Sequence, residues 1–412
     1  MSTLATAVKQ DGRCVVVSGM GAVSAAGVGA LRLWEAARDG QCQVRPLKLE
    51  RPYGGRIKIA AQPPDFDPLA YLEPEILPFC DPFTQYAIVA ADEAMAQARF
   101  GHKDIGGPRT AVVIGSGIGG VKTIDDEAHK EYQTRERADP LTVPRLIPSA
   151  APTMLGMRYS CNGPTFAIAS ACSSASQAIG VGLQMIRSGA VDRAIVGGAE
   201  AAVINGSLRS WEALRVLTPD CCRPFSIGRN GIVLGEGAAI FVLETEALAR
   251  ARGHEPLCEL AGYGTTSDGF DPLRPNVEGP SSAMRQALAD AGLGPDDIDY
   301  LNAHGTGTYA NDIAESEAIL RVFGERGERM AVSSTKPIHG HALGASGAME
   351  LAITIFALRA QLVPPTIHFK AADPKCPIDP VPHEARRVAV RAAMSNSFAF
   401  GGINSVLVVR RA

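Results

Sequence analysis

The sequence lacks the features that mark nucleic-acid-binding, zinc-binding or membrane-spanning proteins. Its 412 residues carry a formal net charge of −3, which argues against general binding to nucleic acid. The nine cysteines are scattered, with no Cys-x-x-Cys pair and no cysteine–histidine cluster at zinc spacing. No apolar run reaches the length of a membrane span, and residues 1–13 lack the apolar core of a signal peptide. We therefore expect a cytoplasmic protein in a reducing compartment.

Aromatic residues are also scarce, at 6% of the chain, whereas 46% of the residues are hydrophobic and glycine is abundant. That profile is typical of an α/β protein with tightly packed glycine turns, and the length suits two domains or one two-lobed unit. β-Branched runs at 14–18 and 110–114 predict buried strands, the first ending at the glycines of 19–21. An apolar stripe over 84–99 predicts a helix. Residues 121–146 are charged, which indicates an excursion from the core.

A glycine-rich run, Gly115-Ser-Gly-Ile-Gly-Gly120, follows the second predicted strand and resembles the dinucleotide fingerprint G-x-G-x-x-G. A dinucleotide site would need an acidic residue at the end of another strand about twenty positions on. The charged stretch found there offers no convincing strand of that kind. Tight glycine packing is therefore the favoured interpretation, and a nucleotide site is the alternative.

Residues 166–180, centred on Cys172, predict a buried strand, a tight turn and a helix that starts with small residues. A cysteine in this place lies at the positive end of the helix dipole, which favours the thiolate. The same residue suits a packing role at a strand–helix junction, because free cysteines are often buried. Partners elsewhere in the chain decide between a nucleophile and a packing residue.

Three motifs in the second half of the chain combine polar or aromatic side chains with glycine turns. His304 directly follows a predicted strand, at the edge of a sheet where α/β sites gather. Lys336, His341 and Glu350 surround a second glycine-rich turn, and such groups are costly in an apolar setting unless they are paired. The third motif, at 396–402, has two phenylalanines before two glycines. Similar turn-and-helix patterns in both halves suggest a duplicated α/β unit with a site between the halves.

Taken together, the motifs resemble those of β-ketoacyl-acyl carrier protein synthases in order and spacing. The similar segments are Ser-Ala-Cys172-Ser-Ser, Asn-Ala-His304-Gly-Thr-Gly-Thr, Gly-His341-Ala-Leu-Gly-Ala-Ser-Gly and Asn-Ser-Phe-Ala-Phe-Gly-Gly. The chain is identified as a member of the synthase II branch, which has nodulation-type and type II polyketide relatives. The resemblance implies the thiolase fold, a five-layer αβαβα arrangement of two similar α/β halves at 13–252 and 253–412, normally in a dimer.

The resemblance also implies a role for each motif. Cys172 would accept an acyl chain from a carrier thioester, and His304 and His341 would hold the enolate oxygen formed when a malonyl thioester loses CO2. Lys336 would orient this site, and Glu350 would support it as a neighbouring carboxylate. The implied activity is that of a decarboxylating 3-oxoacyl-carrier synthase, with acyl transfer followed by Claisen condensation with malonyl-carrier protein.

Further residues of the site follow from the same resemblance. The backbone N–H groups of Cys172 and Phe400 would form the oxyanion hole, and Phe398 and Phe400 resemble the gate between the acyl pocket and the malonyl site. Thr306 and Thr308 match threonines that bind the phosphopantetheine arm of the carrier. No cofactor is required. The family can hold a structural monovalent cation, sodium or potassium, whose ligand positions match Asn302, Glu350, Ser395 and Asn396.

The implied partners are an acidic acyl carrier protein and a second subunit. An acidic carrier needs a basic docking face, which Arg215, Arg135 and Arg137 would supply. Ordinary solvated surface is the competing interpretation of these arginines. Residues 74–83, usually basic in synthase II, are not basic here. The second subunit would be another copy of the chain or a ketosynthase-like protein.

The sequence departs from the family pattern in three places. His339 stands where the motif usually has a threonine, and we expect His341 to be catalytic and His339 to pack behind it. Ala399 replaces a glycine of the gate, which would limit opening if a positive φ were required there. Residues 223–232 have lost two acids and a phenylalanine of the family, which weakens a role in housekeeping fatty-acid synthesis. The replacing residues are Ser226, Asn230 and Ile232.

The alternatives differ in what they require. A specialised ketosynthase subunit for polyketide, polyene or nodulation-type acyl chains would act with a chain-length-factor-like partner, and its motifs would be the same. The intact Cys172, His304 and His341 disfavour a catalytically silent partner subunit. A thiolase would need a second cysteine as base near the site. The dinucleotide-binding oxidoreductase depends on residues 115–120 alone.

Overall fold

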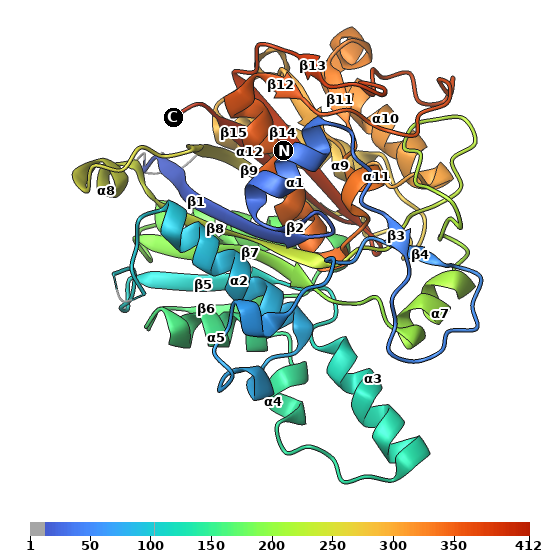
Figure 1. Cartoon of the computed structure of the whole chain (residues 1–412). Coiled ribbons are helices and arrows are strands. Elements are labelled where there is room, and N and C mark those ends of the chain that lie inside the picture. Colours follow the sequence, from blue (N-terminus) through green and yellow to red (C-terminus); the bar gives the residue numbers. More distant parts are fainter. Residues whose placement is uncertain (1–12, 103) are drawn as a thin grey trace.

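The computed structural model describes residues 13–102 and 104–412, and at its centre is a mixed sheet made of two equivalent halves (Figure 1). The strands of the first half are β1 (Val15–Ser24), β5 (Thr110–Gly115), β6 (Thr165–Ile168), β7 (Arg193–Glu200) and β8 (Gly237–Thr245). Those of the second are β9 (Cys258–Ser267), β10 (Tyr300–Asn302), β11 (Ala331–Ser333), β14 (Ala392–Ala399) and β15 (Ile403–Arg410). The prediction that residues 1–13 lack the apolar core of a signal peptide falls almost entirely on residues 1–12, which lie outside the described residues.

The two halves have the same strand order. It is β6-β5-β7-β8-β1 in the first half and β11-β10-β14-β15-β9 in the second, which is third, second, fourth, fifth and first along the chain in both. The parallel and antiparallel pairs also correspond. β1 and β9 pair antiparallel and join the halves. The fold is therefore a duplicated α/β unit, as the recurring motifs predict.

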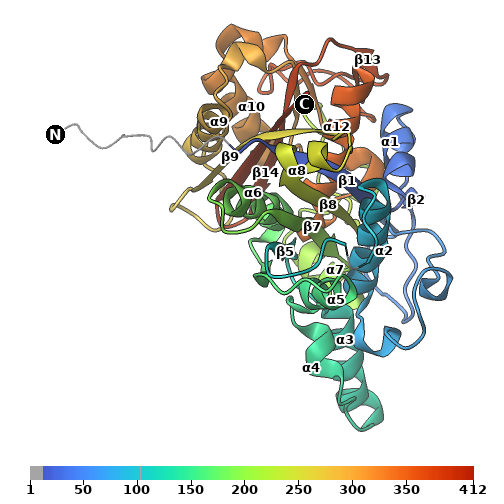
Figure 2. The same ribbon diagram turned by 90° about the vertical axis from the view of Figure 1, so that its left-hand side faces the viewer.

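Helices complete the five-layer arrangement that the resemblance implies (Figures 1 and 2). The main helices are α1 (Ala30–Arg38), α2 (Pro82–Gln97), α5 (Ala150–Arg158), α6 (Ser174–Arg187), α9 (Glu278–Ala291), α10 (Tyr309–Phe323) and α12 (Ser346–Ala360). α6 and α12 contact each other in the central layer, with α1 beside α12. α2 and α5 cover the outer face of the first half, and α9 and α10 cover that of the second.

Shorter elements lie around this core. They are β2 (Gly27–Val28), β3 (Arg45–Pro46), β4 (Ile59–Ala60), β12 (Leu362–Val363), β13 (Arg386–Arg387), α3 (Val121–His129), α4 (Thr142–Leu146), α7 (Asn205–Ala213), α8 (Glu246–Ala251) and α11 (Lys336–His339). α3 and α4 project from the body as an arm (Figure 2), as the charge of this stretch predicts.

Two features of the first half differ from the expectations. β1 does not end at Gly19 and Gly21 but continues through them to Ser24. A Cβ atom at either glycine would overlap backbone atoms of α2, so these glycines allow close helix packing rather than a turn. The strand before Cys172 is not buried, because β6 lies at the edge of the sheet and its Thr165 and Phe166 are exposed.

One helical stretch, Leu343–Ala360, is long and apolar enough to cross a membrane by length and composition, which corrects the expectation that no run reaches that length. Of this stretch, 83% is buried inside the fold. It consists of a short 3-10 turn, η7 (Leu343–Ala345), followed by α12 in the central layer. Because α12 contacts strands of both halves, it is apolar nearly all round.

Candidate active site

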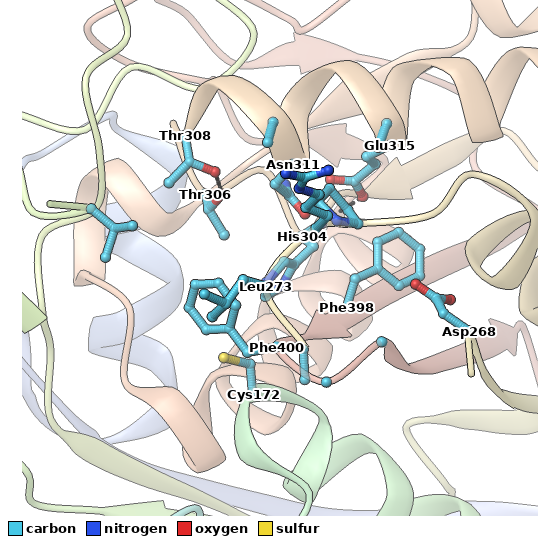
Figure 3. A pocket seen from close by; sticks show the side chains of 18 of the residues that line it. Cys172, Asp268, Leu273, His304, Thr306, Thr308, Asn311, Glu315, Phe398 and Phe400 are labelled. Atoms are coloured by element: carbon cyan, nitrogen blue, oxygen red, sulfur yellow. Dashed lines mark hydrogen bonds between the residues drawn. The ribbon is translucent and has the colours of Figure 1, made fainter. Parts of the chain in front are cut away.

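Cys172 lies on a sharp turn between β6 and α6. The turn is a 3-10 segment, η4 (Ala171–Ser173), in which Ala171 has a φ of 48°, a left-handed conformation that alanine adopts only under constraint. The Ser173 hydroxyl lies 2.9 Å from the Ser397 carbonyl oxygen and so ties the turn to the second half. The Cys172 side chain is 4% exposed and borders a cavity between the halves (Figure 3).

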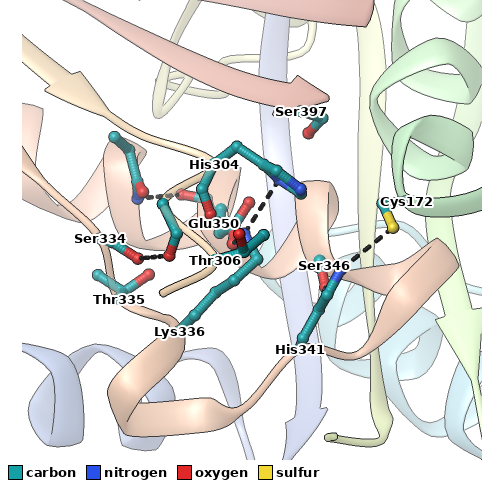
Figure 4. Close-up of polar contacts among 12 residues, drawn as sticks. Cys172, His304, Thr306, Ser334, Thr335, Lys336, His341, Ser346, Glu350 and Ser397 are labelled. Carbon is teal, nitrogen blue, oxygen red and sulfur yellow. Dashed lines mark hydrogen bonds and ion pairs between the residues drawn. The ribbon is translucent and has the colours of Figure 1, made fainter. Parts of the chain in front are cut away.

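His341 contacts the thiol directly. Its Nε2 atom lies 3.1 Å from Cys172 Sγ, and its Nδ1 atom lies 2.8 Å from Ser346 Oγ (Figure 4). The backbone N–H of His341 donates to the Val233 carbonyl oxygen at 2.7 Å, which fixes the residue against the first half. Both ring nitrogens of His341 are therefore held in place.

Lys336 holds the second histidine of the site in one tautomer. The Lys336 side chain is 1% exposed, and its ammonium group contacts Glu350 Oε1, the His304 carbonyl oxygen at 2.5 Å and His304 Nδ1 at 3.2 Å. An ammonium group only donates hydrogen bonds, so Nδ1 accepts and the ring proton lies on Nε2. The His304 ring lies edge-on to that of His341, with centroids 5.4 Å apart. His304 therefore brings an N–H donor to the cavity that Cys172 lines.

Burial sets the protonation of these groups. It raises the pKa of the Cys172 thiol to about 12, and the positive charge of Lys336 opposes this rise. Burial, and then Lys336, lower the pKa of His304 and of His341 well below the usual value, so both imidazoles are neutral. Burial thus opposes the thiolate that the helix start favours, and at neutral pH the resting thiol keeps its proton.

Cys172, His304 and His341 also have the composition of a metal site. The thiol sulfur and one ring nitrogen of each histidine lie within 4.8 Å of one another. A histidine ligand, however, must present an unprotonated nitrogen, and Lys336 occupies Nδ1 of His304, which leaves the proton on Nε2. The tautomer therefore favours hydrogen bonding to a substrate oxygen over coordination of a metal.

The cavity beside Cys172 has a volume of about 160 Å³ and is lined by both halves of the chain (Figure 3). Phe398, near the end of β14, is 8% exposed, and its ring centroid lies 6.2 Å from that of His304. Phe400, on the turn after β14, is 37% exposed. One phenylalanine of the predicted gate is thus packed beside the histidine, and the other lies at the mouth of the cavity.

Other walls of the cavity come from residues that the motifs indicate only in part. Thr306 and Thr308 line it, with their hydroxyl oxygens 2.8 Å apart. Ile232, which replaces the phenylalanine usual in the family, lines it too. Trp211 of α7 and residues of the loop 268–275 complete the wall, and sequence reasoning did not find them because no motif contains them.

The two departures near the catalytic motifs have local explanations. His339 is buried with Nε2 3.0 Å from Thr335 Oγ1 and does not line the Cys172 cavity. Burial lowers its pKa to about 3. Ala399 ends β14, pairs with Ile403 and lies outside the positive-φ region. The positive φ values of this turn are those of Gly401, at 84°, and Gly402, at 68°. No glycine conformation is therefore needed at Ala399.

The four residues matched to a cation site are all buried, and each has a side-chain oxygen without a hydrogen-bond partner in the described structure. Asn302 and Ser395 are register partners on β10 and β14, and the Asn302 amide donates to the Glu350 carbonyl oxygen at 3.2 Å. The side chain of Asn396 points to the opposite face of β14, where its amide lies 3.2 Å from Glu315 Oε1. Three unpaired oxygens on one face fit a hard cation, whereas the Asn396 side chain is separated from them.

The three predicted docking arginines lie in two separate parts of the molecule. Arg215 is exposed two residues after α7 and next to Val216, which lines the cavity. Arg135 and Arg137 are exposed and follow the π-helical turn η3 (Lys130–Thr134), between α3 and α4 on the projecting arm (Figure 1). The single chain therefore places only Arg215 at the mouth of the cavity.

The glycine-rich run at 115–120 surrounds a carboxylate of the protein itself, that of Glu200. The buried carboxylate of Glu200 accepts hydrogen bonds from the backbone N–H groups of Gly117 at 2.7 Å, Ile118 at 3.3 Å and Gly344 at 2.9 Å. Burial raises the pKa of Glu200 to about 7, and these N–H groups oppose the rise. A phosphate has no place in a turn filled in this way, so the run joins the two halves instead of binding a nucleotide.

Comparison with known proteins agrees with this geometry. Residues 13–249 match the family "Beta-ketoacyl synthase, N-terminal domain", and residues 257–370 match "Beta-ketoacyl synthase, C-terminal domain". The chain is similar to "Nodulation protein E" of Rhizobium meliloti, with 40% identity over 402 residues that cover 97% of this chain and 99% of the relative. It is 38% identical over 408 residues to "3-oxoacyl-(acyl-carrier-protein) synthase 2" of Staphylococcus aureus (strain COL), covering 96% and 98% of the two chains.

Solved structures show the same relationship. "The ishigamide ketosynthase/chain length factor" superposes with a TM-score of 0.93 and 34% identity, covering 97% of this chain and 99% of that one. A type II ketosynthase in complex with its acyl-carrier protein, "AntDE:AntF (apo)", gives a TM-score of 0.90 and 28% identity over 97% and 100%. The chain therefore belongs to the β-ketoacyl synthase family and is a condensing acyltransferase with the thiolase fold.

Proposed function

We propose that the chain is a β-ketoacyl-acyl carrier protein synthase in which Cys172 carries the growing acyl chain. The Cys172 sulfur attacks the carbonyl carbon of an acyl-carrier thioester, the thiol proton passes to the carrier sulfur that leaves, and an acyl-Cys172 thioester remains. The observation that carries the proposal is the 3.1 Å contact between Cys172 Sγ and His341 Nε2 at the start of α6. Backbone N–H groups of Cys172 and Phe400 would stabilise the tetrahedral oxyanion.

In the second step a malonyl-carrier thioester loses CO2. The electron pair of the broken C–C bond moves onto the thioester oxygen, where His304 Nε2–H donates a hydrogen bond. The Ser346 hydroxyl can donate to Nδ1 of His341, which leaves an Nε2–H group as the second donor. The enolate carbon then attacks the acyl carbon, and Cys172 leaves as the thiolate and regains a proton. Lys336 and Glu350 position His304 throughout.

Two variants separate these steps. Cys172→Ala should form no acyl-enzyme, and Cys42→Ala, which removes an exposed cysteine, should acylate normally. His304→Ala should acylate but release no CO2 from malonyl-carrier protein. Intact mass measures the first step and CO2 release the second. An acyl-enzyme on Cys172→Ala would sink the nucleophile, and normal decarboxylation by His304→Ala would sink the donor role.

We also propose that the partner in both steps is an acidic acyl carrier protein whose phosphopantetheine arm enters past Thr306 and Thr308. The complex of a 28% identical ketosynthase with its carrier supports this. Arg215 would contact the carrier beside the cavity mouth. Arg135 and Arg137 would contribute only if a second subunit brings its arm to this mouth. The exposed edge strand β6 is the natural pairing surface for such a subunit, a second copy or a ketosynthase-like protein.

Three unpaired buried oxygens support a structural monovalent cation beside Glu350. Asn302 Oδ1, Ser395 Oγ and Glu350 Oε2 would hold sodium or potassium. Burial raises the pKa of Glu350 to about 7, and the charge of Lys336 opposes this rise. A bound cation would favour the ionised form further. Its contribution is to fix Glu350, and through Lys336 the tautomer of His304.

A second candidate is a specialised ketosynthase subunit for polyketide, polyene or nodulation-type acyl chains, acting with a chain-length-factor-like partner. Ile232 in the cavity wall favours it, because the family usually has a phenylalanine there. Similarity to a nodulation protein and to a ketosynthase/chain length factor points the same way. Product masses from a panel of carrier proteins, with co-purification of the partner, distinguish the two. The nine free cysteines support a cytoplasmic location for either.

A further inference from the structure

The mouth of the Cys172 cavity is closed by side chains from different halves of the chain. Phe400 comes from the turn between β14 and β15, and Trp211 comes from α7 in the first half. Their ring centroids lie 5.9 Å apart with the planes tilted by 38°. Both residues line the cavity. This arrangement is an attractive aromatic pair between segments nearly 190 residues apart in the sequence.

The turn closes a hairpin in which Ala399 pairs with Ile403, and it is tied to the loop at 268–272 by two backbone hydrogen bonds. Asp268 N–H donates to the Gly402 carbonyl oxygen at 2.8 Å, and a Cβ atom at Gly402 would lie 2.5 Å from the Asp268 Cβ atom. Around Gly401 there is open space, because a Cβ atom there would meet nothing within 4 Å. A single hydrogen bond, from Gly401 N–H to the Pro272 carbonyl oxygen at 2.9 Å, holds that side. These bonds place the backbone of the turn, whereas the Phe400 side chain is 37% exposed and has the Trp211 ring as an aromatic neighbour.

We propose that Trp211 is a positioning residue that holds Phe400 in the closed arrangement over the Cys172 cavity. The Trp211 indole, in the first half of the chain, limits the movement of the Phe400 ring, in the second half. Access to the Cys172 thiol therefore depends on a contact between the two halves. An aromatic pair of this kind shifts an equilibrium by a few-fold to about tenfold. The role in catalysis rests on the proposed function, since the gate matters there by admitting the malonyl thioester to acyl-Cys172.

Alkylation of Cys172 by N-ethylmaleimide tests the Trp211–Phe400 clamp, meaning the contact by which Trp211 holds Phe400 over the cavity, without any carrier or acyl substrate. The rate at the Cys172 peptide is measured by mass spectrometry for Trp211→Ala, Phe400→Ala and the double variant. Trp211→Ala should raise the rate a few-fold to about tenfold, and it should add nothing once Phe400 is absent. Trp211→Phe, which keeps an aromatic ring, should stay near the wild-type rate. Leu214→Ala, an exposed residue just after α7, is the matched control and should leave the rate unchanged.

Tryptophan emission gives a second measurement if Trp211→Ala does not fold. The chain has two tryptophans, so Trp34→Phe leaves Trp211 as the single indole. Phe400→Ala in this background should change the emission, and so should acylation of Cys172. If the two substitutions multiply their effects on alkylation, or if the emission ignores Phe400, Trp211 is only part of the wall and the proposal is overturned. If Cys172 is acylated but the alkylation rates refute the clamp, the proposed function still stands. If the alkylation rates support the clamp but Cys172 is not acylated, the clamp still stands and the proposed function fails.

Discussion

Lys336 permits a quantitative test of how the site is held together. Lys336→Met keeps most of the side-chain volume but leaves the buried carboxylate of Glu350 without its cation, a change that typically costs about 3–5 kcal/mol. For 412 residues the entropy of unfolding is about 0.9 kcal/mol/K, so the melting temperature should fall by about 3–6 °C. The loss should be measured by scanning calorimetry, with and without potassium, because a cation at Glu350 would reduce it.

The double variant Lys336→Met/Glu350→Gln separates stability from activity. With both charges removed, most of the lost melting temperature should return, since a neutral pair needs no desolvated ion. Decarboxylation should not return, because no ammonium group remains to fix the proton of His304 on Nε2. A double variant as unstable as the single one would refute the charge argument. Recovered decarboxylation in that double variant would refute the tautomer argument.

The pH dependence of Lys336→Met follows from the same contacts. Lys336 lowers the pKa of Glu350, so without it the folded pKa rises above the value of about 7. An acid whose folded pKa is raised loses stability as pH rises from its unfolded pKa toward its folded one. Because the folded pKa of Glu350 is already about 7 in the wild type, both proteins lose the same stability up to that pH, and the deficit of the variant should grow above about pH 7. Lys336 also lowers the pKa of His304 and of His341, so the acid limb of the residual decarboxylation should move to higher pH in the variant.

Three further outcomes are expected. Glu200→Gln should lower stability by about 1–3 kcal/mol, because an amide nitrogen then faces backbone N–H donors. Calorimetry measures this loss, and Glu255→Gln, at an exposed position, is the control. Equal melting temperatures of the two variants would count against the role of Glu200 in joining the two halves. Replacing potassium by choline should lower the wild-type melting temperature, and the difference should disappear in Ser395→Ala if its oxygen binds a cation. Arg215→Glu should slow acylation from an acyl carrier several-fold but not from a small acyl thioester, and equal slowing of both would remove Arg215 from the docking face.

The fold and the catalytic motifs were predictable because each motif is continuous in sequence. Cys172 at a strand–helix turn and His341 in a glycine-rich turn carry their own local geometry, and family order brought them together. The closing contact at the cavity mouth was not predictable, because Trp211 meets Phe400 only after two distant segments fold against each other. The edge position of β6 was missed as well, since its apolar composition does not reveal which strand has a neighbour on one side only.

Electrostatic detail was the least accessible to sequence reasoning. The start of α6 favours a thiolate at Cys172, yet burial raises the thiol pKa to about 12, and burial depends on packing across the whole site. The proposed cation ligands divide in the same way. Asn396 follows Ser395 in sequence, but strand alternation sends its side chain to the face where Glu315 lies. Side chains of adjacent strand residues point to opposite faces of the sheet, and a family pattern alone does not show which of them faces the site.

The duplicated turn has a consequence for the order of events during turnover. Ala171 and Leu343 share the same left-handed conformation, with φ values of 48° and 43°, and each is the first residue of an equivalent 3-10 turn, directly before the second residue of that turn. The first copy has Cys172 there, whereas the second has Gly344, where a Cβ atom would overlap the backbone of Gly117. The second copy therefore has no room for a side chain. In the proposed function only Cys172 holds the acyl chain between the two steps, so the first carrier departs before the malonyl carrier reacts, which gives ping-pong kinetics.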